Sequence, residues 1–143
     1  MHISHYMTQP VIAAEPDEGV RTAFFRMREA GIRHLPVLDR NRHLLGWISD
    51  RDLRRPDWVD PDADTSFGYR LEDDLLVRDL MTTNVVAVHT YDPVRKAAAV
   101  ILDRKYGALP VLDKTGACVG VLSAIDLVRA LSDMLAAQAA GVK

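Results

Sequence analysis

The sequence predicts an α/β protein made of two pseudo-symmetric copies of one unit, each in the order strand, helix, strand, strand, helix. The first observation is an internal repeat: a shift of 74 positions places Met7 on Met81 and continues without a gap to Arg55 on Arg129. The second is that short apolar runs and helical spacing follow the same order in both copies. The third is size, because a unit of about fifty residues is too small to close its own core. Two copies are therefore expected to pack around an approximate two-fold axis.

The elements of the first copy follow from its apolar pattern. Residues 11–14 are a short apolar run that predicts a strand, and a turn after them leads to apolar residues at helical spacing over residues 20–31. The apolar runs at 35–38 and 44–48 predict two more strands, joined by a polar turn. A short helix is expected to begin near Ser49.

The second copy reproduces this order. Its strands and first helix are expected at residues 85–88, 94–102, 109–112 and 119–122. A final helix is expected from Ser123, and its apolar stripe continues through Leu131 and Leu135 into an alanine-rich tail. Such a stripe is more typical of packing, within the chain or at a dimer interface, than of a ligand site.

The two copies define the expected domains. Residues 1–55 form the first repeat, residues 56–74 a connector, and residues 75–143 the second repeat with the C-terminal helix. The connector holds two prolines and seven acidic residues against one basic residue, which predicts an exposed loop. The leucines of residues 71–81 predict a helix that leads into the second repeat.

The composition is that of a soluble globular protein and restricts the classes of function. The formal charge of -2, from 18 basic and 20 acidic residues, gives no general attraction to nucleic acid or to an anionic membrane. No apolar run reaches the length of a membrane span and the N-terminus lacks a signal-peptide pattern, so we expect a cytoplasmic protein. The single cysteine, Cys118, lies in an apolar run and is expected to be a buried apolar residue rather than a reactive thiol.

A serine and an aspartate recur where the last strand of each copy meets its last helix. Ser49-x-x-Asp52 and Ser123-x-x-Asp126 have the spacing of a capping box, in which the hydroxyl accepts a backbone N–H and the acid lies near the positive end of the helix. This structural role alone accounts for both residues. The same arrangement is compatible with holding the phosphate and the ribose hydroxyls of a nucleotide.

Three ordered blocks occur twice: Met-Thr before a short valine strand, Leu-Pro-Val-Leu-Asp, and Gly-x-x-Ser-x-x-Asp. Together they resemble the cystathionine-beta-synthase (CBS) domain, and two in tandem resemble a Bateman module. The matching segments, residues 7–55 and 81–129, cover about two thirds of the chain with no catalytic domain beside them, as in a stand-alone CBS pair. The resemblance implies two clefts between three-stranded sheets, which in the family often bind AMP, ADP, ATP, NAD or S-adenosylmethionine. Mg²⁺ is expected only together with ATP, if ATP is the ligand.

The resemblance also implies which residues line each cleft. In the family, a threonine at the strand entrance and the backbone before Leu-Pro-Val frame the base, while the serine and aspartate of the other repeat reach the phosphate and the ribose. Carried over by position, the first cleft would consist of Thr82, Val85, Val86, Gly107, Ala108 and Pro110 with Ser49, Arg51 and Asp52. The second would consist of Thr8, Val11, Ile12, Arg33, His34 and Pro36 with Ser123 and Asp126.

The two clefts differ in the residues that would face the ligand. Gly107-Ala108 leaves open backbone where the base approaches, whereas Arg33-His34 brings bulk and charge to the same place. Arg51 can donate to a phosphate, and the equivalent residue of the second repeat is Ile125. We therefore expect the first cleft to bind the nucleotide more tightly.

Three other classes of function compete with this interpretation. An enzyme is disfavoured because nucleophile-elbow, Walker and zinc-protease motifs are lacking, and His2 with His5 lacks a third metal ligand, so no catalytic residue and no metal site is assigned. A nucleic-acid module is suggested only by Arg51, Arg54 and Arg55, which precede the acidic connector. A ligand-independent module for dimerisation or protein interaction is the strongest alternative. The expected function is a regulatory sensor that binds an adenosyl nucleotide and transmits occupancy to a homodimer or to an unknown target protein.

Overall fold

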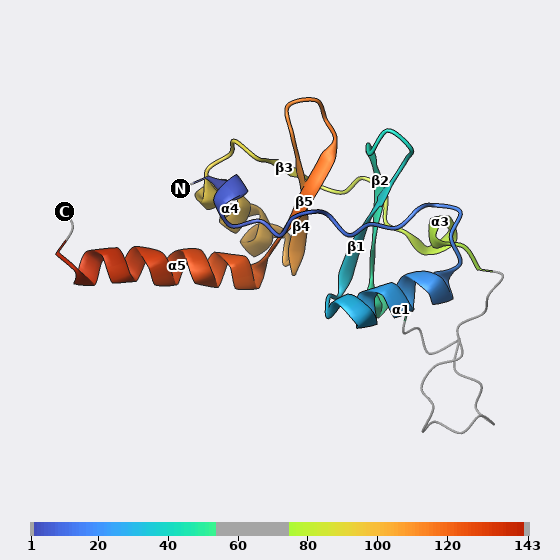
Figure 1. The fold of residues 1–143 in the computed structure, drawn as a ribbon, viewed down its shortest axis with the longest axis horizontal. Coiled ribbons are helices and arrows are strands. Elements are labelled where there is room, and N and C mark those ends of the chain that lie inside the picture. Colours follow the sequence, from blue (N-terminus) through green and yellow to red (C-terminus); the bar gives the residue numbers. More distant parts are fainter. Residues whose placement is uncertain (1, 54–74, 142–143) are drawn as a thin grey trace, which may run out of the picture. The chain divides into compact units, whose positions relative to one another are not determined.

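A computed structural model describes residues 2–53 and 75–141 of the protein (Figure 1). The expected connector, residues 56–74, lies outside the described residues. Helices and strands occur in both repeats, which confirms the predicted α/β class. The elements are η1 (Ile3–His5), α1 (Val20–Ala30), β1 (His34–Leu38), β2 (Leu44–Ser49), α2 (Asp50–Leu53), α3 (Val77–Leu80), β3 (Val88–His89), α4 (Val94–Arg104), β4 (Ala108–Leu112), β5 (Cys118–Ser123) and α5 (Ala124–Ala139).

The chain forms two compact units whose boundaries differ from those of the sequence repeats. The central unit spans Ile12–Val85, and the terminal unit combines Met1–Val11 with Val86–Lys143. The leading segment of each repeat therefore belongs to the unit that contains the rest of the other repeat. The expected division at residues 1–55 and 75–143 describes the repeats of the sequence, and the units of the fold exchange their leading segments.

In the central unit, β1 and β2 form an antiparallel pair. Two single-residue bridges extend it: Ala14 pairs in parallel with Val37 of β1, and Thr82 pairs with Trp47 of β2 in antiparallel fashion. The strand expected at residues 11–14 is therefore reduced to Ala14. A longer parallel strand would need a backbone N–H at Pro36, and proline has none.

In the terminal unit, β3 lies parallel to β4, and β4 lies antiparallel to β5, which forms the expected three-stranded sheet. Thr8 pairs with Val121 of β5, as Thr82 pairs with Trp47 in the central unit. The strand expected at residues 85–88 begins only at Val88, where Pro110 of β4 imposes the same limit as Pro36. The pairings of the two units are thus equivalent under the shift of 74 positions.

Each unit has its own buried cluster of side chains. Val77 of the second repeat is fully buried in the central cluster, and the equivalent Ile3 of the first repeat is fully buried in the terminal cluster. Burying such a side chain stabilises a fold by about 1.5–3 kcal/mol, and this burial favours docking of each exchanged segment onto its unit. Cys118 is also buried, which confirms the expected burial of this side chain.

Short helices dock the leading segments onto the turn before the first long helix of each unit. In the central unit, Val77 N–H donates to Glu18 O at 2.8 Å. In the terminal unit, Ile3 N–H donates to Asp92 O at 3.0 Å, and η1 lies beside α4 (Figure 1). The helix expected over residues 71–81 is α3, which is shorter, and its counterpart η1 was not expected from the sequence.

The C-terminal helix α5 continues beyond the sheet of its own unit (Figure 1). Its last residues are exposed, and so are several large apolar side chains along its length. These are Ile125, Val128, Leu131, Met134 and Leu135. Among the described residues, no helix combines the length and the apolar character needed to cross a membrane.

Candidate functional site

The repeated serine and aspartate form the same reciprocal cap in both units. Ser49 N–H donates to Asp52 Oδ2 at 2.9 Å, and Asp52 N–H donates to Ser49 Oγ at 3.2 Å. In α5, Ser123 N–H donates to Asp126 Oδ2 at 2.8 Å, and Asp126 N–H donates to Ser123 Oγ at 3.2 Å. The capping box predicted from the spacing is therefore confirmed. Oδ1 of each aspartate takes no part in these hydrogen bonds, so the cap and a ligand do not compete for one oxygen atom.

The central unit brings Thr82 to the strand that ends in this cap. Trp47 N–H donates to Thr82 O at 2.9 Å, and Thr82 N–H donates to Trp47 O at 2.8 Å. Trp47 lies two residues before Ser49 on β2, so its side chain lies on the same face of the strand as that of Ser49. The unit thus holds five of the residues predicted for the first cleft, namely Ser49, Arg51, Asp52, Thr82 and Val85.

The terminal unit repeats this arrangement with the other threonine. Thr8 N–H donates to Val121 O at 2.8 Å, and β5 then ends at Ser123. This unit contains Thr8, Val11, Ser123 and Asp126 of the predicted second cleft, together with Val86, Gly107, Ala108 and Pro110 of the first. The remaining residues of the second cleft, Ile12, Arg33, His34 and Pro36, belong to the central unit. In both units a threonine of one repeat pairs with the strand of the other repeat that ends in the serine of the cap.

A cation is present at only one of the two equivalent positions beside the caps. Arg51 is exposed in the first turn of α2, directly after Ser49 and Asp50. The equivalent residue in α5 is Ile125, whose side chain is 69% exposed. An arginine can form paired, charge-assisted hydrogen bonds with a phosphate, and an isoleucine cannot. The central unit therefore has the stronger chemistry for a phosphate.

His34 is held against Trp47 in the central unit. The two rings lie 5.4 Å apart at an angle of 30°. Burial of the ring lowers the pKa of His34 below its ordinary value of 6.5, and the carboxylates of Asp50 and Asp52 only partly oppose this shift. His34 is therefore predominantly uncharged at neutral pH and adds bulk rather than charge. Trp47 was not among the residues predicted for either cleft, although its place two residues before the cap serine puts it on the same face of β2 as Ser49.

The backbone before Leu-Pro-Val contacts the start of the last helix of each repeat, α2 in the first and α5 in the second. Asp50 N–H donates to Arg33 O at 2.9 Å, and Ala124 N–H donates to Gly107 O at 3.0 Å. Gly107 is exposed and Ala108 is buried, and neither residue has a large side chain. The structure therefore retains the contrast between the Gly107-Ala108 and Arg33-His34 positions that the sequence predicts.

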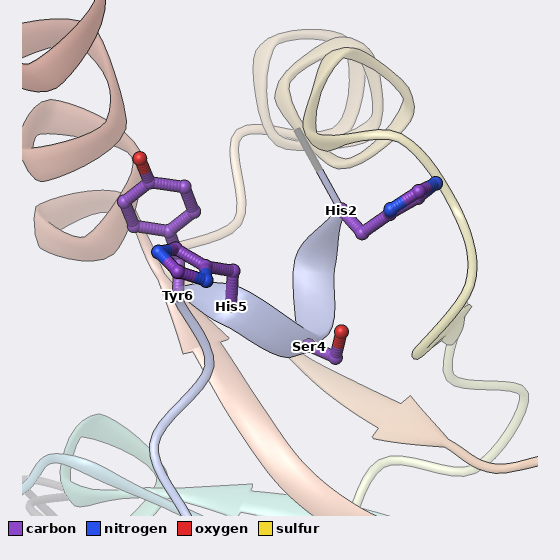
Figure 2. A pocket seen from close by; sticks show the side chains of 4 residues that line it. All are labelled: His2, Ser4, His5 and Tyr6. Atoms are coloured by element: carbon purple, nitrogen blue, oxygen red, sulfur yellow. The ribbon is translucent and has the colours of Figure 1, made fainter.

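A surface pocket of about 400 Å³ lies elsewhere in the terminal unit, and it is lined by His2, Ser4, His5 and Tyr6. Figure 2 shows that His2 and Ser4 point away from His5 and Tyr6, so the polar groups do not converge on one point. Tyr6 is already engaged, because its hydroxyl donates to Asp133 Oδ2 at 2.8 Å. Within the described parts of the chain, no group of three or more His, Cys, Asp or Glu residues is placed to hold a metal ion.

Comparison with known proteins places this arrangement in a family. The sequence model of the CBS domain matches twice, at residues 3–57 and 77–133. A CBS domain-containing protein of Dictyostelium discoideum is 30% identical over 137 residues, which cover 93% of this chain and 92% of that protein. The chain therefore belongs to the CBS domain family. Its two copies form a tandem CBS pair, or Bateman module.

Solved structures agree with this assignment. The crystal structure of CBSX2, a protein of Arabidopsis thaliana, in complex with AMP is 30% identical and has a TM-score of 0.76, covering 93% of this chain and 97% of that one. The chloroplastic CBSX2 sequence is longer, and the match spans 62% of its length. The CBS domain pair of protein MJ0100, solved with 5'-methylthioadenosine and S-adenosyl-L-methionine, is 22% identical with a TM-score of 0.75 over 94% of this chain and 98% of that one, and it shows the same fold.

Proposed function

We propose that the protein is a regulatory module that binds an adenosyl nucleotide through the central unit. The observation that carries this proposal is the pairing of Thr82 with Trp47, which brings a threonine of one repeat to the strand that ends in Ser49 and the cap of the other. The CBSX2 structure supports the ligand class, because that relative is 30% identical and contains AMP. The residues of the central unit that belong to the proposal are Thr82, Val85, Ser49, Arg51 and Asp52.

Each polar side chain of the central unit has a separate task in this proposal. Asp52 accepts hydrogen bonds from the ribose hydroxyls through Oδ1, the oxygen atom that the cap does not use. Arg51 donates to the phosphate, and its exposed position lets the guanidinium reach it. The exposed hydroxyl of Thr82 faces the base. These groups bind and orient a ligand without breaking a covalent bond, so we propose a sensor and not an enzyme.

The terminal unit contains residues for a second nucleotide site, which we expect to bind its ligand more weakly. Thr8, Ser123 and Asp126 repeat the central arrangement, but Ile125 replaces the phosphate donor. Asp126 is only 4% exposed and its Oδ1 lies 3.6 Å from Arg129, so this carboxylate is less accessible to a ligand. We expect this site to favour ligands with less phosphate charge than ATP. Its other predicted contact within this unit is Val11.

Occupancy has an effect only if the ligand prefers one of two states of the protein. The exposed stripe on α5 suggests that one of these states is a homodimer. Ile125, Val128, Leu131 and Leu135 follow one another at helical spacing and are each more than half exposed. A stripe on one helix suits a two-fold contact, in which the same surface of a second copy covers it. A target protein that uses this stripe is the alternative.

The dimer is tested by placing a charge on this stripe. Leu131→Glu should convert the dimer to a monomer in sedimentation equilibrium, because a carboxylate would be buried without a partner. Leu45→Glu is the matched control, since Leu45 is an exposed apolar residue of β2 outside the stripe. A monomeric wild-type protein at high concentration, with and without nucleotide, would exclude the homodimer and leave the target protein as the partner of α5.

Nucleotide binding is tested by calorimetric titration with AMP, ADP, ATP with and without Mg²⁺, NAD and S-adenosylmethionine. Asp52→Asn retains one oxygen for the cap but loses the charge and one acceptor, and Asp126→Asn is the matched change in the terminal unit. Loss of the tighter binding in Asp52→Asn alone supports the central site. A folded wild-type protein that binds none of the ligands would refute the proposal and favour the ligand-independent interaction module.

A further inference from the structure

Each exchanged segment passes over a glycine that leaves no room for a side chain. A Cβ atom on Gly46 would lie 2.7 Å from Met81 Sδ and 2.9 Å from Thr82 O. A Cβ atom on the equivalent Gly120 would lie 2.9 Å from Met7 Sδ and 2.8 Å from Thr8 O. Both glycines are therefore required by the close approach of another segment. The same contact occurs independently in two units.

The methionine in each contact is fixed from the other side by the short helix that precedes it. Met81 N–H donates to Val77 O at 2.9 Å, and Met7 N–H donates to Ile3 O at 2.9 Å. Val77 and Ile3 are fully buried, so each short helix is anchored in the cluster of its unit. The methionine side chains are half-buried and pack against the same clusters. Each segment is thus held at both ends of a short span.

The threonine that follows each methionine is positioned by this contact. Thr82 is held by two backbone hydrogen bonds to Trp47, while its own side chain is exposed and makes no part of the core. The place of the Thr82 hydroxyl therefore depends on how closely the segment lies on β2. Gly46 allows that close approach, and the Met81 side chain lies directly over Gly46.

We propose that Gly46 and Met81 are positioning residues for Thr82, and that Gly120 and Met7 serve Thr8 in the same way. This inference rests on the proposed function, which assigns the two threonines to the ligand. Its consequence is that the two sites are adjusted separately, each through its own glycine and methionine. A change at position 46 should alter ligand binding in the central unit and leave the terminal unit unchanged.

The matched pair Gly46→Ala and Gly120→Ala tests this independence, with AMP as the probe in calorimetry and amide hydrogen exchange as a second measurement. Gly46→Ala should weaken the tighter AMP site about tenfold or more, since overpacking moves the segment outward. It should also speed exchange at Thr82 N–H and leave Thr8 N–H unchanged. Gly120→Ala should show the opposite exchange pattern and retain the tighter AMP affinity. Equal effects of both variants on both amides, or no effect of Gly46→Ala, would overturn the proposal.

The role of Met81 is tested with substitutions that differ in the size of the side chain. Met81→Leu fills nearly the same volume and should retain AMP affinity within about twofold, whereas Met81→Ala leaves a void and should weaken it about tenfold. Equal affinities for the two variants would remove Met81 from the proposal. If the wild-type protein does not bind AMP, the proposed function fails, and hydrogen exchange at Thr82 in the same variants still decides whether Gly46 and Met81 position it.

Discussion

The central and terminal units use one backbone arrangement for two different chemical surfaces. Both pair a threonine with the last strand, and both end that strand in a serine–aspartate cap. At equivalent positions, however, Arg51 in the central unit corresponds to Ile125, and Trp47 corresponds to Val121. The difference teaches that the residues that recur maintain the geometry, while the residues that do not recur set the chemical character of each surface.

The turn before the first long helix shows the same division between geometry and chemistry. Glu18 accepts the N–H of Glu15 at 2.7 Å, and the equivalent Asp92 accepts the N–H of His89 at 2.8 Å. The cationic partners differ, because Arg26 pairs with Glu18 through both of its terminal nitrogens, whereas Asp92 lies 3.3 Å from Lys96 Nζ. This repeated acid was not recognised in the sequence, because a glutamate and an aspartate stand at the equivalent positions.

The largest expected effect concerns the anchors of the exchanged segments. Ile3→Ala should destabilise the terminal unit by about 3 kcal/mol, because it removes a fully buried side chain and leaves a cavity. Urea unfolding followed by hydrogen exchange within each unit measures the loss. Leu102→Ala is the control in the same unit, since Leu102 is 78% exposed and its truncation should cost less than about 0.5 kcal/mol. Equal losses would mean that the exchanged segment contributes little to the terminal unit.

Exchanging the residues beside the caps should have the next largest effect. Arg51→Ile should weaken AMP binding in the central unit by about 1.5–3 kcal/mol, since a charge-assisted hydrogen bond to the phosphate is lost. Ile125→Arg should strengthen AMP binding in the terminal unit, because it supplies the missing donor. Titration of both variants and of the combined change measures the two sites. If Arg51→Ile binds AMP like the wild type, Arg51 does not contact the phosphate.

A smaller effect on folding stability is expected when the pH is lowered, because Glu18 becomes protonated. Burial raises the pKa of Glu18, but the hydrogen bonds from Arg26 and the Glu15 N–H outweigh it and bring the pKa below the ordinary value of 4.5. A carboxylate with a lowered pKa in the folded state contributes stability above its ordinary pKa and loses it as the pH falls through the lower folded value.

Glu18→Gln should therefore cost about 1 kcal/mol at pH 7, where partial exposure of the pair limits the interaction. The difference from the wild type should shrink as the pH falls below 4.5. Urea unfolding of both proteins between pH 7 and pH 3 measures it. A difference that stays constant over this range would show that the charge of Glu18 contributes nothing.

The smallest effect is expected at His34. Because burial lowers its pKa, the ring should titrate below its ordinary value of 6.5 in an NMR titration of the histidine side chains. Trp47→Ala uncovers the ring and should move the titration upward toward the ordinary value. An unchanged midpoint in this variant would show that Trp47 does not account for the burial.

The cap and the buried cysteine were predicted correctly because both depend on neighbours in the chain. A hydroxyl three residues before a carboxylate at a helix start favours the reciprocal cap, so the local arrangement of Ser123 and Asp126 could be predicted without the fold. The first strand of each copy was predicted too long for a complementary reason. Its length depends on the partner strand, where Pro36 and Pro110 offer no N–H, and the apolar run itself contains no sign of that limit.

The sequence by itself determined the repeat, the order of elements, the family and the caps, since each of these follows from spacing within a short window. Only the tertiary structure decided that the leading segments exchange, so that Ile3 is buried in one unit and Val77 in the other. It also decided that Thr82 pairs with Trp47 over Gly46. These pairings join residues far apart in the chain, and packing selects such partners by burial and close approach rather than by local propensity.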